Sequence, residues 1–243
     1  MPTPKQINPF FPTNGVIEDS RFVYGRDKDI KEIFEWLNDY CSVSIVGDRG
    51  VGKSSLLKTI CQQSRTYLKQ SREPIYINLQ VINSTDEFYA AICDGIGIEF
   101  CEGYYFYRKL KLGKYRLLLV IDEIEGMFTD GFSDHVLDNL RGLAEGMDSP
   151  CKLVLASATS LDELFSKTKR MTSRLEGICI VHNLKKWDEE TSRDFINSRL
   201  NCFVDTTITF EENEISELID ASEGHPQKLM ESCHRLFKAK QIL

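Results

Sequence analysis

Residues 41–58 read CSVSIVGDRGVGKSSLLK, a short β-favouring run followed by a glycine-rich loop and a helical pattern. The run 42–46 is apolar enough for a buried strand, and residues 47–54 fit G-x-x-x-x-G-K-[ST]. Apolar residues then recur at helical spacing, at Leu56, Leu57, Ile60 and Cys61. This succession of strand, loop and helix is a P-loop, or Walker A motif, which binds the phosphates of a nucleotide.

The chemistry of phosphate binding explains the glycines. A phosphate chain needs several backbone N–H groups at close range with no side chain between them, and glycine permits both the tight turn and the approach. The following helix adds unpaired N–H groups and the positive end of its dipole. We expect Lys53 to reach the β- and γ-phosphates and Ser54 to ligate Mg²⁺. The loop residues predicted to contact ATP or ADP are Gly47, Asp48, Arg49, Gly50, Val51, Gly52, Lys53, Ser54 and Ser55.

A second strand, predicted over residues 115–121, is apolar without alternation, as in a parallel sheet covered on both faces. It ends in Asp122 and Glu123, and an α/β sheet places its chemistry at the carboxyl ends of such strands. We expect Asp122 to hold Mg²⁺ through water and Glu123 to act as general base toward the attacking water. The pair is therefore interpreted as Walker B.

The next buried strand, predicted over 152–156, is expected to lie between the two Walker strands. A hydroxyl at its tip, Ser157, would then sense the γ-phosphate, although Ser and Thr here are equally common as helix caps. A basic run, 167–174, precedes the last predicted strand, 178–181. Arg174 is either an arginine finger supplied to a neighbouring subunit or part of a solvated basic face.

Helical patterns flank these strands. A helix after Asp27, which could cap it, carries Ile30, Ile33, Phe34 and Leu37 on one face, and a strand over 74–79 is followed by a helix over 84–98. A further helix from about Ser133 places Met147 on its apolar face. The aromatic segment 22–24 is interpreted as a loop that packs on the first helix, or as a functional element.

The segment 103–114, GYYFYRKLKLGK, is a cluster of basic and aromatic residues in an acidic chain. It is interpreted as an amphipathic helix or hairpin that packs its aromatic side chains, with nucleic-acid contact as the alternative.

From residue 185 onward the pattern is helical. A helix is predicted over 189–200, Thr209 and Glu212 are predicted to form a capping box, and Pro226 stands at the first turn of a last helix. We therefore divide the chain into an extended arm (1–20), a nucleotide-binding α/β domain (21–185) and a small helical lid (186–243).

Composition and charge limit the location of the protein, its binding partners and its metal sites. The chain has 243 residues and a net charge of −7, which opposes non-specific attraction to nucleic acid or anionic lipid. Neither a signal peptide nor an apolar run long enough to span a bilayer is recognisable, so we expect a cytoplasmic protein without membrane association. Eight cysteines without C-x-x-C and four histidines without paired spacing favour reduced core thiols and no zinc site.

Together, Walker A, Walker B, a polar strand tip and a helical lid resemble the AAA+ class of P-loop ATPases. More narrowly, the chain resembles bacterial STAND-type ATPases, the signalling NTPases related to NACHT and NB-ARC proteins. The resemblance rests on three features. Ahead of the P-loop, NPF, then Gly15, Val16 and Ile17, then FVYGRDKDI are similar to the family's segment that lies over adenine; VSIVGDRGVGKSSLL matches its Walker A motif; and SEGHPQKL is similar to the G-x-P turn of its lid. Gln227 and Lys228 stand where loader-type AAA+ proteins carry a sensor arginine, which favours the STAND subclass.

The resemblance implies a three-layer parallel sheet of the AAA+/ASCE type with a C-terminal lid, and further nucleotide contacts. These lie in the segment over adenine and in the lid turn, at Phe22, Val23, Tyr24, Gly25, Arg26, His225 and Pro226. It also implies an ATPase that acts as a switch and whose hydrolysis is slow and depends on oligomerisation. The expected partners are further copies of the chain, which form a homo-oligomer when ATP is bound, and an effector or sensor protein. Two alternatives stay open: a DNA-associated AAA+ ATPase of the replication-loader or transposition-regulator type, and a non-hydrolysing module stabilised by nucleotide.

Overall fold

A computed structural model describes residues 7–133, 135–167, 175, 177–202 and 208–242. Its centre is a parallel five-stranded sheet with the order β2-β3-β4-β1-β5. The strands are β1 (Ser42–Val46), β2 (Glu73–Asn78), β3 (Leu117–Asp122), β4 (Cys151–Ser157) and β5 (Cys179–Asn183). β4 pairs with both Walker strands, as the sequence predicts, so the carboxyl ends of β1, β3 and β4 meet at one edge.

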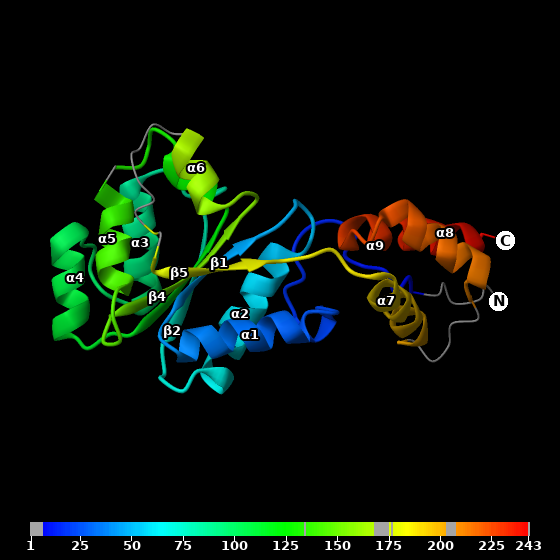
Figure 1. Ribbon diagram of the computed structural model, residues 1–243, viewed down its shortest axis with the longest axis horizontal. Helices are drawn as coiled ribbons and strands as arrows, with labels where there is room; N and C mark the ends of the chain where they lie inside the picture. The colour runs from blue at the N-terminus through cyan, green and yellow to red at the C-terminus, as the bar shows by residue number, and fades with distance from the viewer. Residues whose placement is uncertain (1–6, 134, 168–174, 176, 203–207, 243) are drawn as a thin grey trace, which may run out of the picture.

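Helices cover both faces of the sheet, which makes three layers (Figure 1). On one face, α1 (Asp27–Asn38) and α2 (Lys53–Tyr67) pack against β1, β3 and β4. On the other face lie α3 (Thr85–Ile96), α4 (Gly103–Leu112) and α5 (His135–Ala144). Burial on both faces explains why β3 is apolar at every position before Asp122.

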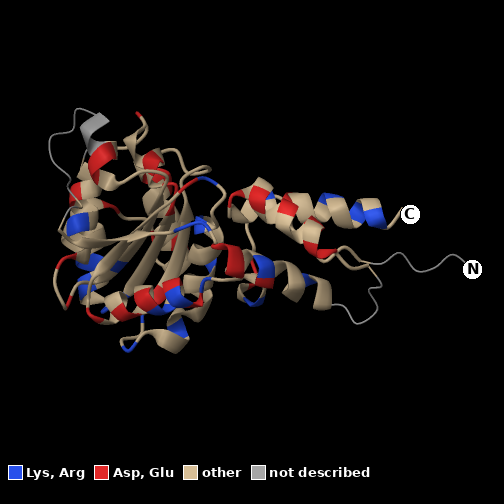
Figure 2. Ribbon diagram, turned by 45° about the vertical axis from the view of Figure 1, so that its right-hand side comes forward, with Lys and Arg blue, Asp and Glu red and all other residues tan. Residues whose placement is uncertain are grey.

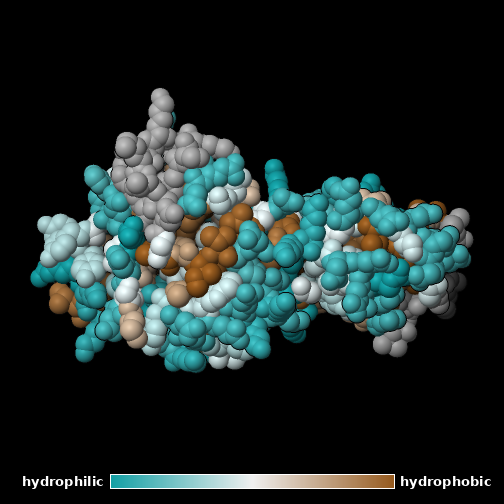
Figure 3. All heavy atoms as spheres, viewed as in Figure 1, coloured by the Kyte–Doolittle hydropathy of each residue, from teal (hydrophilic) through white to brown (hydrophobic). Residues whose placement is uncertain are grey.

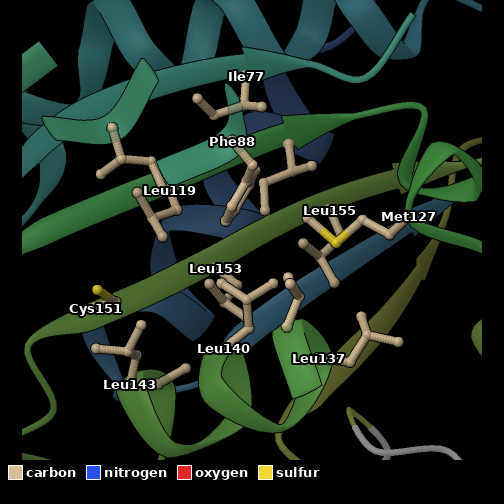
Figure 4. Close-up of a cluster of buried hydrophobic side chains, with 14 of the residues drawn as sticks. Ile77, Phe88, Leu119, Met127, Leu137, Leu140, Leu143, Cys151, Leu153 and Leu155 are labelled. Atoms are coloured by element: carbon tan, nitrogen blue, oxygen red, sulfur yellow. The ribbon is translucent and has the colours of Figure 1, made fainter. Parts of the chain in front are cut away.

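The larger core lies between the sheet and α3 and α5. Figure 4 shows Leu119, Leu153 and Leu155 from the strands pointing toward Leu137 and Leu140 of α5. All five side chains are at most 1% exposed. This packing fixes β3 and β4, and hence the loops that follow them, in one position.

The lid consists of α7 (Glu189–Asn201), α8 (Glu212–Ser222) and α9 (Pro226–Lys240), and it lies beyond the carboxyl edge of the sheet (Figure 1). Its core includes a residue from the other end of the chain: Phe10 is fully buried and stacks on Phe210 at 5.6 Å between ring centroids. Phe195 and Phe237 meet Phe10 edge-on. The described arm residues before Ser20 form no helix or strand, but Phe10 of the arm is part of the lid's core.

Two predicted caps are displaced. The first helix begins at Asp27 itself, so Arg26 occupies the N-cap position and no side chain caps it. In the lid, α8 begins three residues after the predicted cap, and its capping box joins Glu211 and Glu214. A glutamate replaces the expected threonine because its carboxylate also accepts from the N3 amide.

Two short elements complete the α/β domain. A 3₁₀ turn, η2 (Ile124–Phe128), follows Walker B, and α6 (Leu161–Lys167) follows β4, capped by the Ser160 hydroxyl, which accepts from the Glu163 amide 3.2 Å away. Another 3₁₀ turn, η1 (Ser20–Phe22), ends the arm. Met147, expected on an apolar helix face, lies after α5 and is 64% exposed, because the helix ends at Ala144.

The edge strand β5 is only partly covered. Val181 is 51% exposed, and Figure 3 shows apolar atoms at the surface of the sheet domain where β5 lies in Figure 1. Within the described part of the chain, no helix combines the length and the apolar character needed to cross a bilayer.

Candidate nucleotide-binding site

The P-loop takes backbone angles that favour glycine. Gly50 and Gly52 have φ of +78° and +105°, in the left-handed region, and α2 begins directly after Gly52. A Cβ atom on Gly47 would lie 2.8 Å from the carbonyl oxygen of Leu184. The loop therefore depends on glycine both for its turn and for its packing, and it directs the N-terminus of a 15-residue helix at the space above it.

Lys53 lies inside the loop. Its Nζ donates to the carbonyl oxygens of Gly47 at 2.7 Å and Asp48 at 3.1 Å, and the residue is 8% exposed. A lysine held beside a ring of backbone N–H groups can neutralise phosphate charge.

Asp122 is 3% exposed at the end of β3, and neighbours fix its carboxylate. The hydroxyl of Tyr76 on β2 donates to Oδ2 at 2.8 Å, and the amide of Glu123 donates to Oδ1 at 3.1 Å. Burial, the charge of Asp122 and this hydrogen bond raise the pKa of Tyr76, so its hydroxyl keeps its proton. Tyr76 thus holds the Walker B carboxylate in one orientation.

Glu123 has φ +54° and ψ +54°, in the left-handed region that non-glycine residues seldom occupy. Burial raises the pKa of Glu123, as do the charges of Glu125 and Asp122, and these outweigh the opposing charges of Lys53 and Arg49. A carboxylate with raised proton affinity can accept a proton from water more readily.

These residues open into one cavity of about 470 Å³, a size that suits a small-molecule ligand. Three parts of the chain form its walls: the arm, the Walker loops and the lid. The predicted residues that line it are Phe22, Val23, Tyr24, Arg26, Arg49, Gly50, Val51, Gly52, Lys53, Ser54, Ser55, Asp122, Glu123 and Pro226.

The donors in this cavity fit a magnesium nucleotide. Ser54 supplies a hydroxyl and Asp122 a buried carboxylate, both oxygen ligands that Mg²⁺ prefers, and Lys53 supplies the cation for phosphate. Phe22 and Tyr24 also line the cavity, and their rings offer apolar surface on which a base can pack.

The lid touches the P-loop directly. His225 Nε2 lies 2.8 Å from the carbonyl oxygen of Arg49. A Cβ atom on Gly50 would lie 2.8 Å from His225 Cε1. His225 therefore contacts the loop from outside the cavity, whereas its neighbour Pro226 lines the cavity.

Arg26 is a link between elements. Its guanidinium donates to the carbonyl oxygens of Val51 in the P-loop, at 2.8 Å, and Lys185 in the linker to the lid, at 2.9 Å. Burial lowers its pKa, and the nearby Asp29 opposes that shift. Asp29 is in turn 2.8 Å from His182 Nε2 on β5, so the P-loop, the linker and the edge strand share one polar network.

Other predicted residues stand elsewhere. Gly25, Gly47, Asp48, Ser157 and His225 do not line the cavity. The Ser157 hydroxyl donates to the carbonyl oxygen of Thr159 at 2.6 Å, which is the local role of a hydroxyl at a strand exit. Arg174 lies outside the described residues.

The aromatic residues of segment 22–24 contact the lid. Tyr24 meets Trp187 and Phe195 edge-on, and the Arg199 guanidinium lies 5.5 Å from the centroid of Phe22. These ring contacts are thus with the lid, which the expectation of a loop packed on the first helix did not include.

Several cavity residues were not predicted as individual contacts. Those on the arm are Pro12, Thr13, Asn14, Gly15, Val16 and Ile17, and those elsewhere are Asn78, Gln80, Trp187, Phe195, Gln227 and Met230. Asn78 could have been found, because it ends β2 in register with Asp122. Gly15, Val16 and Ile17 belong to the segment that the family resemblance places over adenine, whereas the other arm residues and those of the lid carry no local signal, since only the tertiary arrangement brings them to the P-loop.

Comparison with known families gives one match. A family model described as an AAA domain matches residues 41–165, which span β1 to α6 and include both Walker motifs. No curated protein matches the chain.

Solved structures share the fold at low identity. The Walker-type ATPase PABY2304 of Pyrococcus abyssi has a TM-score of 0.67 and 18% identity, over 91% of this chain and 69% of that one. Cdc6p from Pyrobaculum aerophilum has a TM-score of 0.69 and 14% sequence identity, over 98% of this chain and 66% of that one. The Aeropyrum pernix ORC1 protein, solved in complex with DNA, has a TM-score of 0.66 and 14% sequence identity, over 96% of this chain and 64% of that one. The chain thus spans about two thirds of the length of these proteins, and the likeness concerns the fold.

Proposed function

The chain belongs to the AAA domain family of P-loop ATPases, and from this premise we propose that it is a STAND-type switch that binds ATP with Mg²⁺ and hydrolyses it slowly. Its nucleotide state would set the position of the lid and the formation of a homo-oligomer, in signalling or defence.

One observation carries this proposal: the lid is a wall of the nucleotide cavity and also contacts the P-loop. Pro226, Gln227 and Met230 line the cavity, and His225 lies against the Arg49 carbonyl. A ligand in the cavity therefore touches both parts, and its phosphates change the loop on which the lid rests. To move the lid from 1:99 to 99:1, a nucleotide must bind one arrangement about 5.5 kcal/mol more tightly than the other.

The Walker residues supply the chemistry. Lys53 and the loop amides hold the phosphates, Ser54 and Asp122 hold Mg²⁺, and Tyr76 keeps Asp122 in place. Glu123 takes a proton from the attacking water, for which its raised pKa suits it. We further propose that Arg174 of a neighbouring subunit completes the site, which makes hydrolysis depend on assembly.

The test is to purify the protein without added nucleotide, denature it and identify what is released. Stoichiometric ADP is expected, because a switch holds its resting nucleotide tightly. An empty site with rapid ATP turnover would instead indicate a continuously cycling ATPase and contradict the switch.

A DNA-associated ATPase is the second candidate, favoured by the likeness to the ORC1 structure in complex with DNA. Turnover that DNA stimulates, with a steep dependence on salt, would favour it over the switch. ATP turnover that does not change when DNA is added would argue against the DNA-associated ATPase.

A further inference from the structure

Helix α4 lies at the end of the α/β domain far from the lid (Figure 1). A second hollow is lined by α4 and the loops on either side of it. We call this surface the α4 face and define it by Phe100, Tyr104, Tyr105, Arg108, Lys109 and Leu112. Tyr104 and Tyr105 are each 70% exposed, Leu112 71% and Phe100 56%. The expectation that this segment packs its aromatic side chains is thus wrong for its tyrosines, since α4 buries only Phe106 and Leu110.

The hollow has the size and lining of a docking groove. It measures about 760 Å³. Phe100, Tyr105, Leu112 and Tyr115 supply apolar walls, and Arg108 and Lys109 stand beside them. Exposed apolar side chains gathered in one place, rimmed by charge, mark a site for another molecule. Tyrosine and arginine are also among the residues that most often dominate binding energy.

The helix that carries the α4 face is basic, in contrast to the whole protein, although Glu99 and Glu102 stand at the other side of the groove. The segment carries Arg108, Lys109, Lys111 and Lys114, all exposed, whereas the chain has a net charge of −7. Figure 2 shows acidic residues spread over both the sheet domain and the lid. A local basic surface in an acidic protein selects a partner with carboxylates at the matching positions.

The lining favours a polypeptide over a nucleic acid. Glu99 and Glu102 also line the groove, so its positive charge is confined to Arg108 and Lys109. A phosphate backbone carries a charge on every nucleotide and would meet these two carboxylates as well, whereas a peptide can place its carboxylates on Arg108 and Lys109 alone. Phe100 and Leu112 offer apolar surface without hydrogen-bonding groups, which suits an aliphatic or aromatic side chain of a partner.

We propose that the α4 face docks an acidic amphipathic segment of a partner protein, with apolar anchors in the groove and carboxylates on Arg108 and Lys109. The proposal does not depend on the switch mechanism. Because α4 lies at the opposite end of the molecule from the lid, the segment binds without competing with nucleotide (Figure 1).

The test uses random 16-residue peptides displayed on phage and selected on the full chain, with counter-selection on a Tyr105→Ser, Arg108→Glu variant. Enriched sequences should combine apolar residues at helical spacing with Asp or Glu. Synthetic labelled peptides should bind about tenfold or more weakly to Arg108→Glu alone, as measured by fluorescence anisotropy. Lys28→Glu, the same charge change on the exposed side of α1, should bind like the wild type.

Nucleotide binding by each variant checks that it is folded. Three results would overturn the proposal: no enrichment, enrichment without acidic residues, or peptide binding that Arg108→Glu leaves intact. Labelled oligo(dT) binding that Arg108→Glu abolishes, without peptide binding, would assign the face to nucleic acid instead. Self-association abolished by the same substitution, measured by light scattering, would assign it to a second copy of the chain.

Discussion

Phe10→Ala should destabilise the lid although residue 10 lies more than 170 positions before the lid in the sequence. The Phe10 ring is fully buried and contacts three lid phenylalanines, with centroid distances of 5.6 to 6.3 Å. Truncation of a buried phenylalanine to alanine costs about 3–5 kcal/mol, from lost transfer energy and the cavity left behind. We therefore expect the free energy of lid unfolding to fall by about 3 kcal/mol or more.

The chain offers both a local probe and a matched control. Its two tryptophans lie in different parts, Trp36 on α1 and Trp187 beside the lid, so a Trp36→Phe background leaves the fluorescence of Trp187 to report on the lid. With a urea m value of about 1.5 kcal/mol per molar, the expected loss lowers the lid midpoint by about 2 M. Phe11 is 42% exposed, so Phe11→Ala should cost less than about 1 kcal/mol.

Equal midpoints for the two alanine variants would refute the reasoning, because they would mean that the Phe10 ring contributes no more than its exposed neighbour. A lower urea midpoint for Phe10→Ala, with the midpoint of Phe11→Ala unchanged, would show that the arm and the lid unfold together. The same variant should bind nucleotide more weakly, since arm residues 12–17 line the cavity.

Three further predictions concern the cavity. Lys53→Ala should abolish ATP binding in equilibrium dialysis, whereas Glu123→Gln should bind ATP and lose about 100-fold or more in turnover; full turnover would contradict the Walker B assignment. Tyr76→Phe should raise the Mg²⁺ concentration for half-maximal ATPase activity by about 10- to 100-fold, because Asp122 loses its 2.8 Å donor; an unchanged Mg²⁺ titration would exclude that role. Gly50→Ala should push the lid off the P-loop and speed hydrogen exchange at 223–230, while the open helical position Gly142 should tolerate alanine; equal exchange in both would show that the contact does not hold the lid.

The sequence predicts the sheet domain well because its signals are local. The P-loop combines a strand, a glycine motif and a helical period within 18 residues. The uninterrupted apolar run before Asp122 likewise predicts that β3 is buried on both faces. Parallel-sheet topology then places β4 between the Walker strands. The class of site and its main residues follow from these facts alone.

The part of the cavity that the arm and the lid form cannot be predicted from local sequence patterns. No periodicity connects Phe10 with Phe195 and Phe237, since the contact joins the two ends of the chain. The segment 103–114 shows the opposite limit: its helical period is visible, but whether a tyrosine is buried depends on what packs above it. The caps are missed for a third reason, since the start of a helix is set only to within a few residues by its sequence: α1 begins at Asp27 without a side-chain cap, and α8 begins at Glu212, beyond the predicted Thr209.

The arm limits how far the lid can travel. At one end Phe10 belongs to the lid core, and at the other the amide of Ile17 donates to the Ser55 hydroxyl on α2 at 2.9 Å. Seven residues of extended chain span at most about 25 Å, so the lid can rotate over the P-loop but cannot leave it while both ends are held. Six of these residues, 12–17, line the cavity, so a nucleotide that displaced them would loosen this tether and the His225 contact to the P-loop together. Under the proposed switch, we therefore expect lid release to be cooperative between two segments that are more than 200 residues apart in the chain, and truncating Phe10 should affect both lid stability and nucleotide affinity.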